Sequence, residues 1–105
     1  MPSTHTLRVS SIDRITTNSV VVSFDIPSEF ISSYSFTAGQ YIPLEATIEG
    51  KEVRRSYSIC SAPNSGNLQV GIKELENGLF STYANRTLKV GDSLKVGTPE
   101  GRFIY

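Results

Sequence analysis

The stretch VVVSFDI, residues 20–26, decides the fold class of the chain. Its apolar side chains recur at every second position, and the positions between them include Ser23 and Asp25. A period of two is that of a β-strand with one buried face and one wetter face. The stretch LQVGIK, residues 68–73, has the same alternation. Both stretches therefore predict strands that are buried on one side.

Four more segments rich in β-branched and aromatic residues predict strands, at residues 7–15, 40–48, 52–60 and 93–98. Clusters of Gly, Asn, Pro and Ser separate the segments. One segment differs, from Leu79 to Leu88, because its apolar residues have helical spacing and follow the turn Asn77-Gly78. We therefore expect an all-β fold, in which about six antiparallel strands form a barrel that one short helix caps.

Length and composition limit the possible roles. A chain of 105 residues holds one core but is too short for a catalytic module plus a separate dinucleotide-binding module. Ten Lys and Arg residues balance ten Asp and Glu residues, so no net field recruits nucleic acid or an anionic membrane. The sequence contains no apolar run long enough to cross a bilayer and does not open on a leader-like segment. We expect a soluble cytoplasmic protein.

Cysteine and histidine each occur once, at Cys60 and His5. A single cysteine excludes an internal disulfide, and these two residues leave no ligand set for zinc or an iron–sulfur cluster. No histidine or second cysteine lies near Cys60 in the sequence to activate its thiol, so we expect a small buried residue on the inward face. His5 is expected to be exposed and without a role.

A further stretch, RRSYSICSAP at residues 54–63, combines guanidinium, phenol and hydroxyl groups. On a strand, Arg55 and Tyr57 share one face with Val53 and Ile59. Their positions along that face are about 7 Å apart, given the rise of a strand. Ser58 points to the other face, so it reaches the same ligand only if the strand bends or ends there.

These groups suit an anionic, aromatic ligand. Arginine donates to phosphate oxygens, a tyrosine ring offers a face for stacking, and serine hydroxyls satisfy heteroatoms at a ring edge. A flavin nucleotide has all three features. The alternative is a surface arginine beside a half-exposed strand tyrosine, which composition alone favours.

The turn that opens the predicted helix is a second candidate site. Asn77-Gly78 precedes Leu79, Phe80 and Ser81, and a helix N-terminus presents unpaired N–H groups and the positive end of a dipole. This arrangement suits a phosphate group, to which Ser81 adds a hydroxyl. Many helices begin with a glycine turn, so the feature alone is weak evidence.

Five segments, taken in order, resemble the flavin-binding domain of the ferredoxin–NADP reductase superfamily. They are FTAGQY (36–41), RSYSICS (55–61), GLFS (78–81), VGD (90–92) and PEGRF (99–103). The second fits the superfamily's R-x-Y-S-x-x-S flavin signature, and the resemblance extends from Leu7 to Phe103. Within the superfamily, the segment Tyr83-Ala84-Asn85 after Ser81 and the segment PEGRF look most like the reductase component of multicomponent oxygenases of the phenylacetyl-CoA epoxidase type.

The resemblance implies a six-stranded antiparallel Greek-key barrel with one capping helix, and an FAD-binding domain over residues 1–105. It makes Arg55 the partner of the FAD pyrophosphate, Tyr57 the ring packed on the flavin, and Ser58 the catalytic hydroxyl near flavin N5. The remaining residues that it assigns to cofactor binding are Ser56 in the signature, Gly78, Leu79, Phe80 and Ser81 on the pyrophosphate, and the backbone around Val70, Ile72 and Lys73 along the flavin.

The chemistry implied is hydride transfer from NAD(P)H to flavin, followed by one-electron release to an iron–sulfur centre or oxygenase partner. The superfamily places its NAD(P)-binding domain, and the suggested subfamily a [2Fe-2S] domain, after the flavin domain, so we expect both beyond Tyr105. The subfamily further implies phenylacetate degradation. Two other classes stay open: a non-catalytic β-barrel binding or interaction module, and an enzyme that works through Cys60 or paired carboxylates without flavin.

Overall fold

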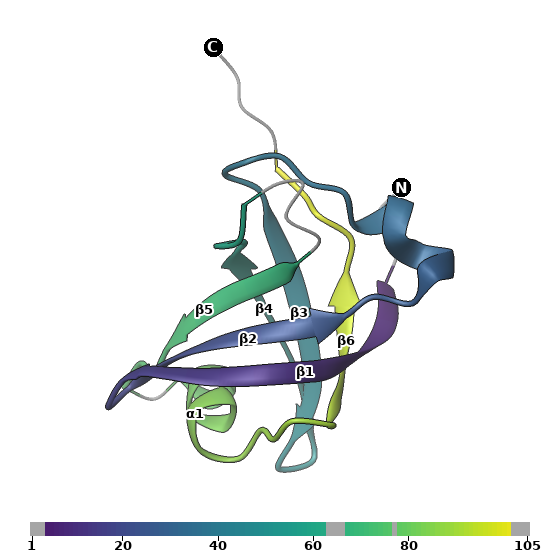
Figure 1. Ribbon diagram of the computed structural model, residues 1–105. Helices are drawn as coiled ribbons and strands as arrows, with labels where there is room; N and C mark the ends of the chain where they lie inside the picture. The colour runs from purple at the N-terminus through teal and green to yellow at the C-terminus, as the bar shows by residue number, and fades with distance from the viewer. Residues whose placement is uncertain (1–3, 63–66, 77, 102–105) are drawn as a thin grey trace.

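The computed structural model describes residues 4–62, 67–76 and 78–101, and Figure 1 shows their arrangement. The elements, in chain order, are β1 (Thr4–Thr16), β2 (Ser19–Asp25), the 3₁₀ helix η1 (Ser28–Tyr34), β3 (Tyr41–Ile48), β4 (Lys51–Ser58), β5 (Leu68–Lys73), α1 (Leu79–Arg86) and β6 (Ser93–Gly97). The six predicted strands and the predicted helix are confirmed, whereas η1 was not predicted. Asn77 of the predicted turn, and Arg102 and Phe103 of the last motif, lie outside the described residues.

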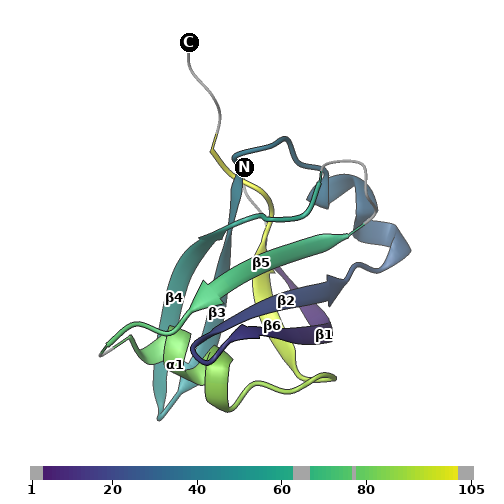
Figure 2. The same ribbon diagram turned by 60° about the vertical axis from the view of Figure 1, so that its left-hand side comes forward.

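The strands form one antiparallel sheet in the order β4-β3-β6-β1-β2-β5. A bridge between Ile59 and Val70 joins the edge strands β4 and β5, so the sheet curls back on itself (Figure 2). Going around the curl, β3, β4 and β5 follow one another and β6 returns to lie beside β3. This order is that of a Greek key, which confirms the predicted fold class.

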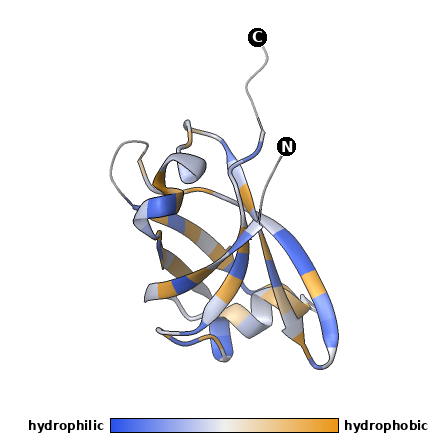
Figure 3. Ribbon diagram, turned by 90° about the vertical axis from the view of Figure 1, so that its right-hand side faces the viewer, coloured by the Kyte–Doolittle hydropathy of each residue, from blue (hydrophilic) through white to orange (hydrophobic). Residues whose placement is uncertain are grey.

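The core lies inside the curl. Hydrophobic and hydrophilic residues alternate along the strands in Figure 3, as the period of two predicts. The inward side chains of the two strands predicted from alternation are all buried, namely Val20, Val22 and Phe24 of β2 and Leu68, Val70 and Ile72 of β5. Ile26, just beyond the end of β2, is only partly buried.

The ladder between β3 and β6 ends at a proline on one side. Only Leu44 and Glu45 of β3 pair with β6, and the next residue towards the start of β3 is Pro43, which has no N–H to donate. Gly97 of β6 lies against this proline, and a Cβ on Gly97 would be 2.3 Å from Pro43 Cγ. The buried Tyr34 hydroxyl donates to the Val96 carbonyl at 2.6 Å. The last residue of η1 thus satisfies a backbone group near the point where the ladder ends.

We predict that Tyr34→Phe lowers the free energy of unfolding by about 1–3 kcal/mol, because it removes the donor from a buried carbonyl. Urea denaturation measures the change. Tyr41→Phe is the matched control, since the Tyr41 side chain lies at the surface, 36% exposed. Equal stability of the two variants would show that the Tyr34 hydroxyl contributes nothing.

The helix α1 covers the end of the barrel where β4 and β5 separate, and it contacts β2, β3, β4 and β5 (Figure 1, Figure 2). Arg86 in its last turn donates two hydrogen bonds to the Glu74 carboxylate, at 3.0 and 2.8 Å. These bonds, and the charges of Arg86 and Arg14, lower the pKa of Glu74. The C-terminal end of α1 is thereby tied to the residue that follows β5.

Arg86→Ala is expected to raise the pKa of Glu74 towards its ordinary value, which side-chain NMR titration of the carboxyl group measures directly. The folded-state pKa of Glu74 lies below the unfolded value, so its contribution to stability exists above the unfolded pKa and is lost as pH falls through the folded one. Lys89→Ala serves as the control of equal charge. A Glu74 pKa that is the same in both variants would rule out the Arg86 contact as the cause.

Candidate functional site

The predicted site residues of β4 lie near the end of the strand, and one of them, Tyr57, contacts α1. Along one face, Val53 and Ile59 are buried, Tyr57 is half-buried and Arg55 is exposed. Burial raises the pKa of the Tyr57 phenol, and the charge of Arg55 lowers it by a smaller amount. The guanidinium is therefore close enough to the phenol to act on it. This agrees with the expectation that the two side chains share one strand face.

The Tyr57 ring rests on α1. Its centroid is 5.7 Å from that of Phe80, with the two planes tilted by 42°, and Phe80 in turn meets the edge of Tyr83 at 6.1 Å. Phe80 is 1% exposed. The Tyr57 ring is thus supported from the core side and remains partly exposed to solvent.

Arg55 is available for an anion. One of its N–H groups donates to the Arg54 carbonyl at 2.7 Å, and it forms no ion pair within residues 4–62, 67–76 and 78–101. Because a guanidinium has five N–H donors, most of its capacity remains open. The adjacent Arg54 points to the other face and lies 3.8 Å from the Glu100 carboxylate. The two arginines therefore have different surroundings despite being neighbours in the sequence.

Ser56 and Ser58 are both exposed, and Ser58 is the last residue of β4, whereas Ser61 is partly buried. Ser58 can reach the ligand of Arg55 and Tyr57 only if the strand bends or ends there, and the strand does end at Ser58. Ser56 lies mid-strand, opposite Pro43 of β3. Their contacts with a cofactor stay predictions.

The turn before α1 is built around Ser81. Its buried hydroxyl accepts a hydrogen bond from the Leu75 N–H at 3.0 Å and donates to the Gly78 carbonyl at 3.2 Å. A Cβ at position 78 would lie 2.4 Å from Ser81 Oγ, so the turn needs glycine there. The hydroxyl is engaged inside the turn. The donors that remain for a phosphate are the N–H groups of the first helical turn, at Leu79, Phe80 and Ser81, which have no acceptor within a helix.

On β5, the side chains of Val70 and Ile72 are fully buried in the core, so they leave only their backbone for the ligand contact, which stays a prediction. Lys73 is exposed at the strand end. Gly71 faces outward, and nothing lies within 4 Å of the position that a Cβ would take. A molecule that lies along β5 would therefore meet open space at Gly71.

Sequence reasoning missed Asn85, which joins the parts of the site. This side chain is 6% exposed, and its Nδ2 donates to the carbonyls of Ile72 at 3.1 Å and Ser81 at 2.9 Å. Its Oδ1 accepts a hydrogen bond from Arg14 of β1 at 3.0 Å, and Arg14 also donates to the Asn85 carbonyl. Sequence analysis used Asn85 only as part of the segment Tyr83-Ala84-Asn85 in the subfamily resemblance, and its position four residues after Ser81 on a short helix gave it no role.

Two predictions were wrong. Cys60 is exposed, because Ile59 takes the buried position in the bridge to Val70 and the next side chain must point outward. Partial desolvation raises the pKa of its thiol. His5 is partly buried and stacks on Phe30 of η1 with centroids 3.9 Å apart, so it holds that helix against β1.

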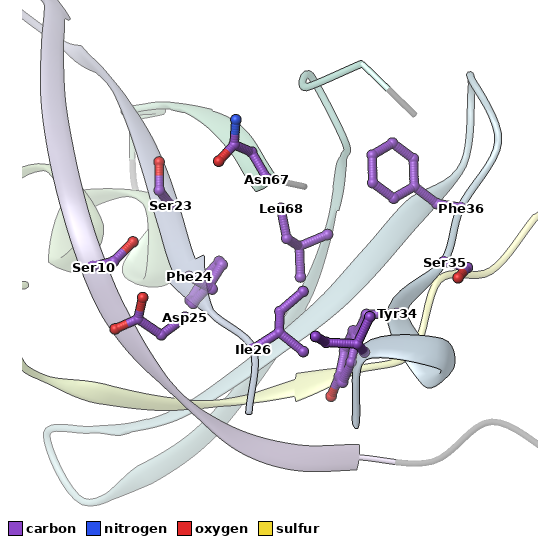
Figure 4. A pocket seen from close by; sticks show the side chains of 11 residues that line it. Ser10, Ser23, Phe24, Asp25, Ile26, Tyr34, Ser35, Phe36, Asn67 and Leu68 are labelled. Atoms are coloured by element: carbon purple, nitrogen blue, oxygen red, sulfur yellow. The ribbon is translucent and has the colours of Figure 1, made fainter. Parts of the chain in front are cut away.

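Two cavities of the structure lie away from the predicted site. One, of about 440 Å³, lies between the Ser10 region of β1, the end of β2, the end of η1 and the start of β5 (Figure 4). A second, of about 220 Å³, lies over β3, β4 and β6. Neither is lined by any predicted site residue. Among the described residues there is no group of His, Cys, Asp and Glu that could hold a metal ion, and no helix long and apolar enough to cross a membrane.

Comparisons with known proteins agree with this geometry. Residues 6–105 match the family model described as the oxidoreductase FAD-binding domain. The chain is 36% identical over its full length to one of the subunits of the 1,2-phenylacetyl-CoA epoxidase of Escherichia coli (strain K12), and it covers 30% of that protein. Over 70 residues, 64% of this chain, it is 47% identical to the NADH-cytochrome b5 reductase 1 of Aspergillus terreus, of which it covers 23%.

Solved structures show the same fold. The flavohem-like FAD/NAD-binding domain of the nitric oxide dioxygenase of Vibrio cholerae superposes with a TM-score of 0.78 at 28% identity, over 95% of this chain and 45% of that one. A ferredoxin NADP+ reductase of Neisseria gonorrhoeae, with bound FAD and NADP, gives a TM-score of 0.79 at 20% identity, over 94% of this chain and 39% of that one. The chain spans less than a third of the length of the epoxidase component and the cytochrome b5 reductase that it resembles in sequence. It belongs to the oxidoreductase FAD-binding domain family, within the ferredoxin–NADP reductase superfamily.

Proposed function

We propose that this domain binds FAD on the surface where β4, β5 and α1 meet, as the flavin domain of an NAD(P)H-dependent reductase. The observation that carries the proposal is the pairing of Arg55 and Tyr57 on one face of β4. A guanidinium without an ion-pair partner among the described residues lies on the same strand face as a half-buried ring, near enough for its charge to act on the phenol. The first turn of α1, with its open N–H groups, begins one residue before Phe80, the support of that ring.

The residues present suit the parts of FAD. Arg55 and the N-terminal turn of α1 offer two sets of donors, which is what the two phosphates of a pyrophosphate require. A phenol is protonated at neutral pH, and burial raises the pKa of Tyr57 further, so the ring offered to the flavin is uncharged. Gly71 leaves room along β5 for the remainder of the molecule.

When bound, the flavin supplies the redox chemistry, taking up a hydride from a reduced nicotinamide and releasing electrons one at a time. The role of this chain is to hold and orient it. We assign the Ser58 hydroxyl, at the end of β4, to a hydrogen bond at flavin N5. Ser56 and the backbone around Val70, Ile72 and Lys73 are assigned to the edge of the site.

We further propose that the donor and acceptor sites belong to other domains. An NAD(P)-binding domain and an iron–sulfur or oxygenase partner would complete the electron path, with a [2Fe-2S] domain as the expected acceptor. The likeness to the E. coli epoxidase component supports a role in phenylacetate degradation. A reductase that serves another oxygenase is supported by the V. cholerae nitric oxide dioxygenase domain.

Arg55→Ala is expected to weaken FAD binding by about 1.5–3 kcal/mol, or about 10- to 150-fold in Kd, because a charged hydrogen bond to phosphate is lost. Titration of FAD with the protein, followed by quenching of flavin fluorescence, measures the affinity. The matched control is Arg54→Ala. It removes the same charge from the neighbouring residue, whose side chain points to the other face of the strand, towards Glu100.

The two arginine variants separate a specific contact from a general effect of charge. The proposal expects the Kd of Arg54→Ala to stay within about twofold of the wild-type value. Equal losses in both variants would remove Arg55 from its assigned role. Absence of FAD binding by the wild-type protein at millimolar FAD would favour the alternative of a non-catalytic β-barrel module.

A further inference from the structure

Phe80 belongs to the motif that the resemblance assigns to the FAD pyrophosphate, yet its side chain is in the wrong place for that role. It is 1% exposed and lies among the core residues of the barrel. A side chain with almost no accessible surface cannot touch a ligand on the outside of the domain. The role of an aromatic ring at position 80 must therefore lie in its contacts with neighbouring side chains.

The nearest aromatic neighbour of Phe80 towards the surface is Tyr57, at 5.7 Å between ring centroids. The Tyr57 hydroxyl has no hydrogen-bond partner within the described parts of the chain. No polar contact among those residues fixes the plane of the Tyr57 ring. Its support on the core side is the tilted contact with Phe80, and aromatic rings at this distance have preferred relative orientations.

Phe80 is itself held firmly, because the helix that carries it is attached at both flanks. On one flank, Ser81 bonds to Leu75 and Gly78, which closes the turn before α1. On the other, Asn85 bonds to the Ile72 carbonyl of β5 and accepts a hydrogen bond from Arg14 of β1. These contacts fix the position of the helix, which carries the buried Phe80 ring.

We infer that Phe80 is a positioning residue, which sets the plane of the Tyr57 ring and through it the stacking of the flavin. The inference rests on the proposed binding of FAD at this surface. It also connects the two halves of the site. The first turn of α1 supplies N–H donors for the pyrophosphate, and the side chain of the same turn orients the ring that meets the flavin.

A double-mutant cycle tests the inference, with the variants Phe80→Leu, Tyr57→Leu and their combination. Replacing Phe80 by leucine keeps an apolar side chain but removes the ring contact, so Kd for FAD should rise about 3- to 10-fold. In the Tyr57→Leu background the same change should alter Kd by less than about twofold, because Phe80 then has no ring to orient. The visible circular dichroism spectrum of bound flavin should change in the same direction in Phe80→Leu and in Tyr57→Leu.

Phe24→Leu is the matched control, since it makes the same substitution at a buried position in β2, where the side chain lines the cavity of Figure 4. It should leave Kd and the flavin spectrum unchanged. Far-UV circular dichroism and urea denaturation verify that each variant is folded. If Phe80→Leu does not fold, Phe80→Met replaces it in the cycle, because methionine fills irregular core space without a ring.

The outcomes are distinct. Coupling between the two positions, with the control unchanged, supports the inference. A loss of affinity on Phe80→Leu that is equal in both backgrounds overturns it, since Phe80 would then act without Tyr57, and so does an unchanged Kd in the wild-type background. Failure of the wild-type protein to bind FAD contradicts the proposed function itself, whatever the variants do.

Discussion

Incomplete closure of the barrel is the constraint on which the rest of the structure depends. The edge strands β4 and β5 meet at the bridge between Ile59 and Val70 and separate towards the other end, where α1 fills the space with the buried residues Phe80 and Ala84. Open strand edges expose unpaired backbone groups and need cover. The helix gives that cover, and the same divergence creates the surface on which Arg55, Tyr57 and the first turn of α1 come together.

Closing the barrel with a helix brings polar groups into the interior, and each has a partner. Asn85 and Ser81 satisfy backbone groups of β5 and of the turn before α1, and Tyr34 satisfies the Val96 carbonyl where the ladder between β3 and β6 ends. Within the described residues no buried side-chain nitrogen or oxygen lacks a hydrogen-bond partner. Because an unsatisfied buried group costs about 1–3 kcal/mol, the bonds of Ser81 and Asn85 fix the position of α1 more sharply than apolar packing alone.

Local patterns were enough to predict the strands, the helix and the residues that share a face. The alternation at residues 20–26 and 68–73 marks the core faces of β2 and β5, and the signature from Arg55 to Ser61 gives the family and the candidate site. Contacts between distant parts of the chain could not be predicted. Arg14 and Asn85 are 71 positions apart, and no period in either segment indicates that they meet. The roles of His5 and η1 depend likewise on a contact that only the folded chain creates, and the outward direction of Cys60 depends on the bridge at Ile59.

An NMR titration of the 15N-labelled protein with FAD tests the location of the site most directly. If FAD binds where β4, β5 and α1 meet, the largest amide shifts will fall on Arg55, Tyr57 and residues 79–81. The amides of Phe24 and Leu68, beside the 440 Å³ cavity, will then change little. Shifts that cluster around that cavity, with Arg55 and Tyr57 unaffected, would contradict the assignment of the site.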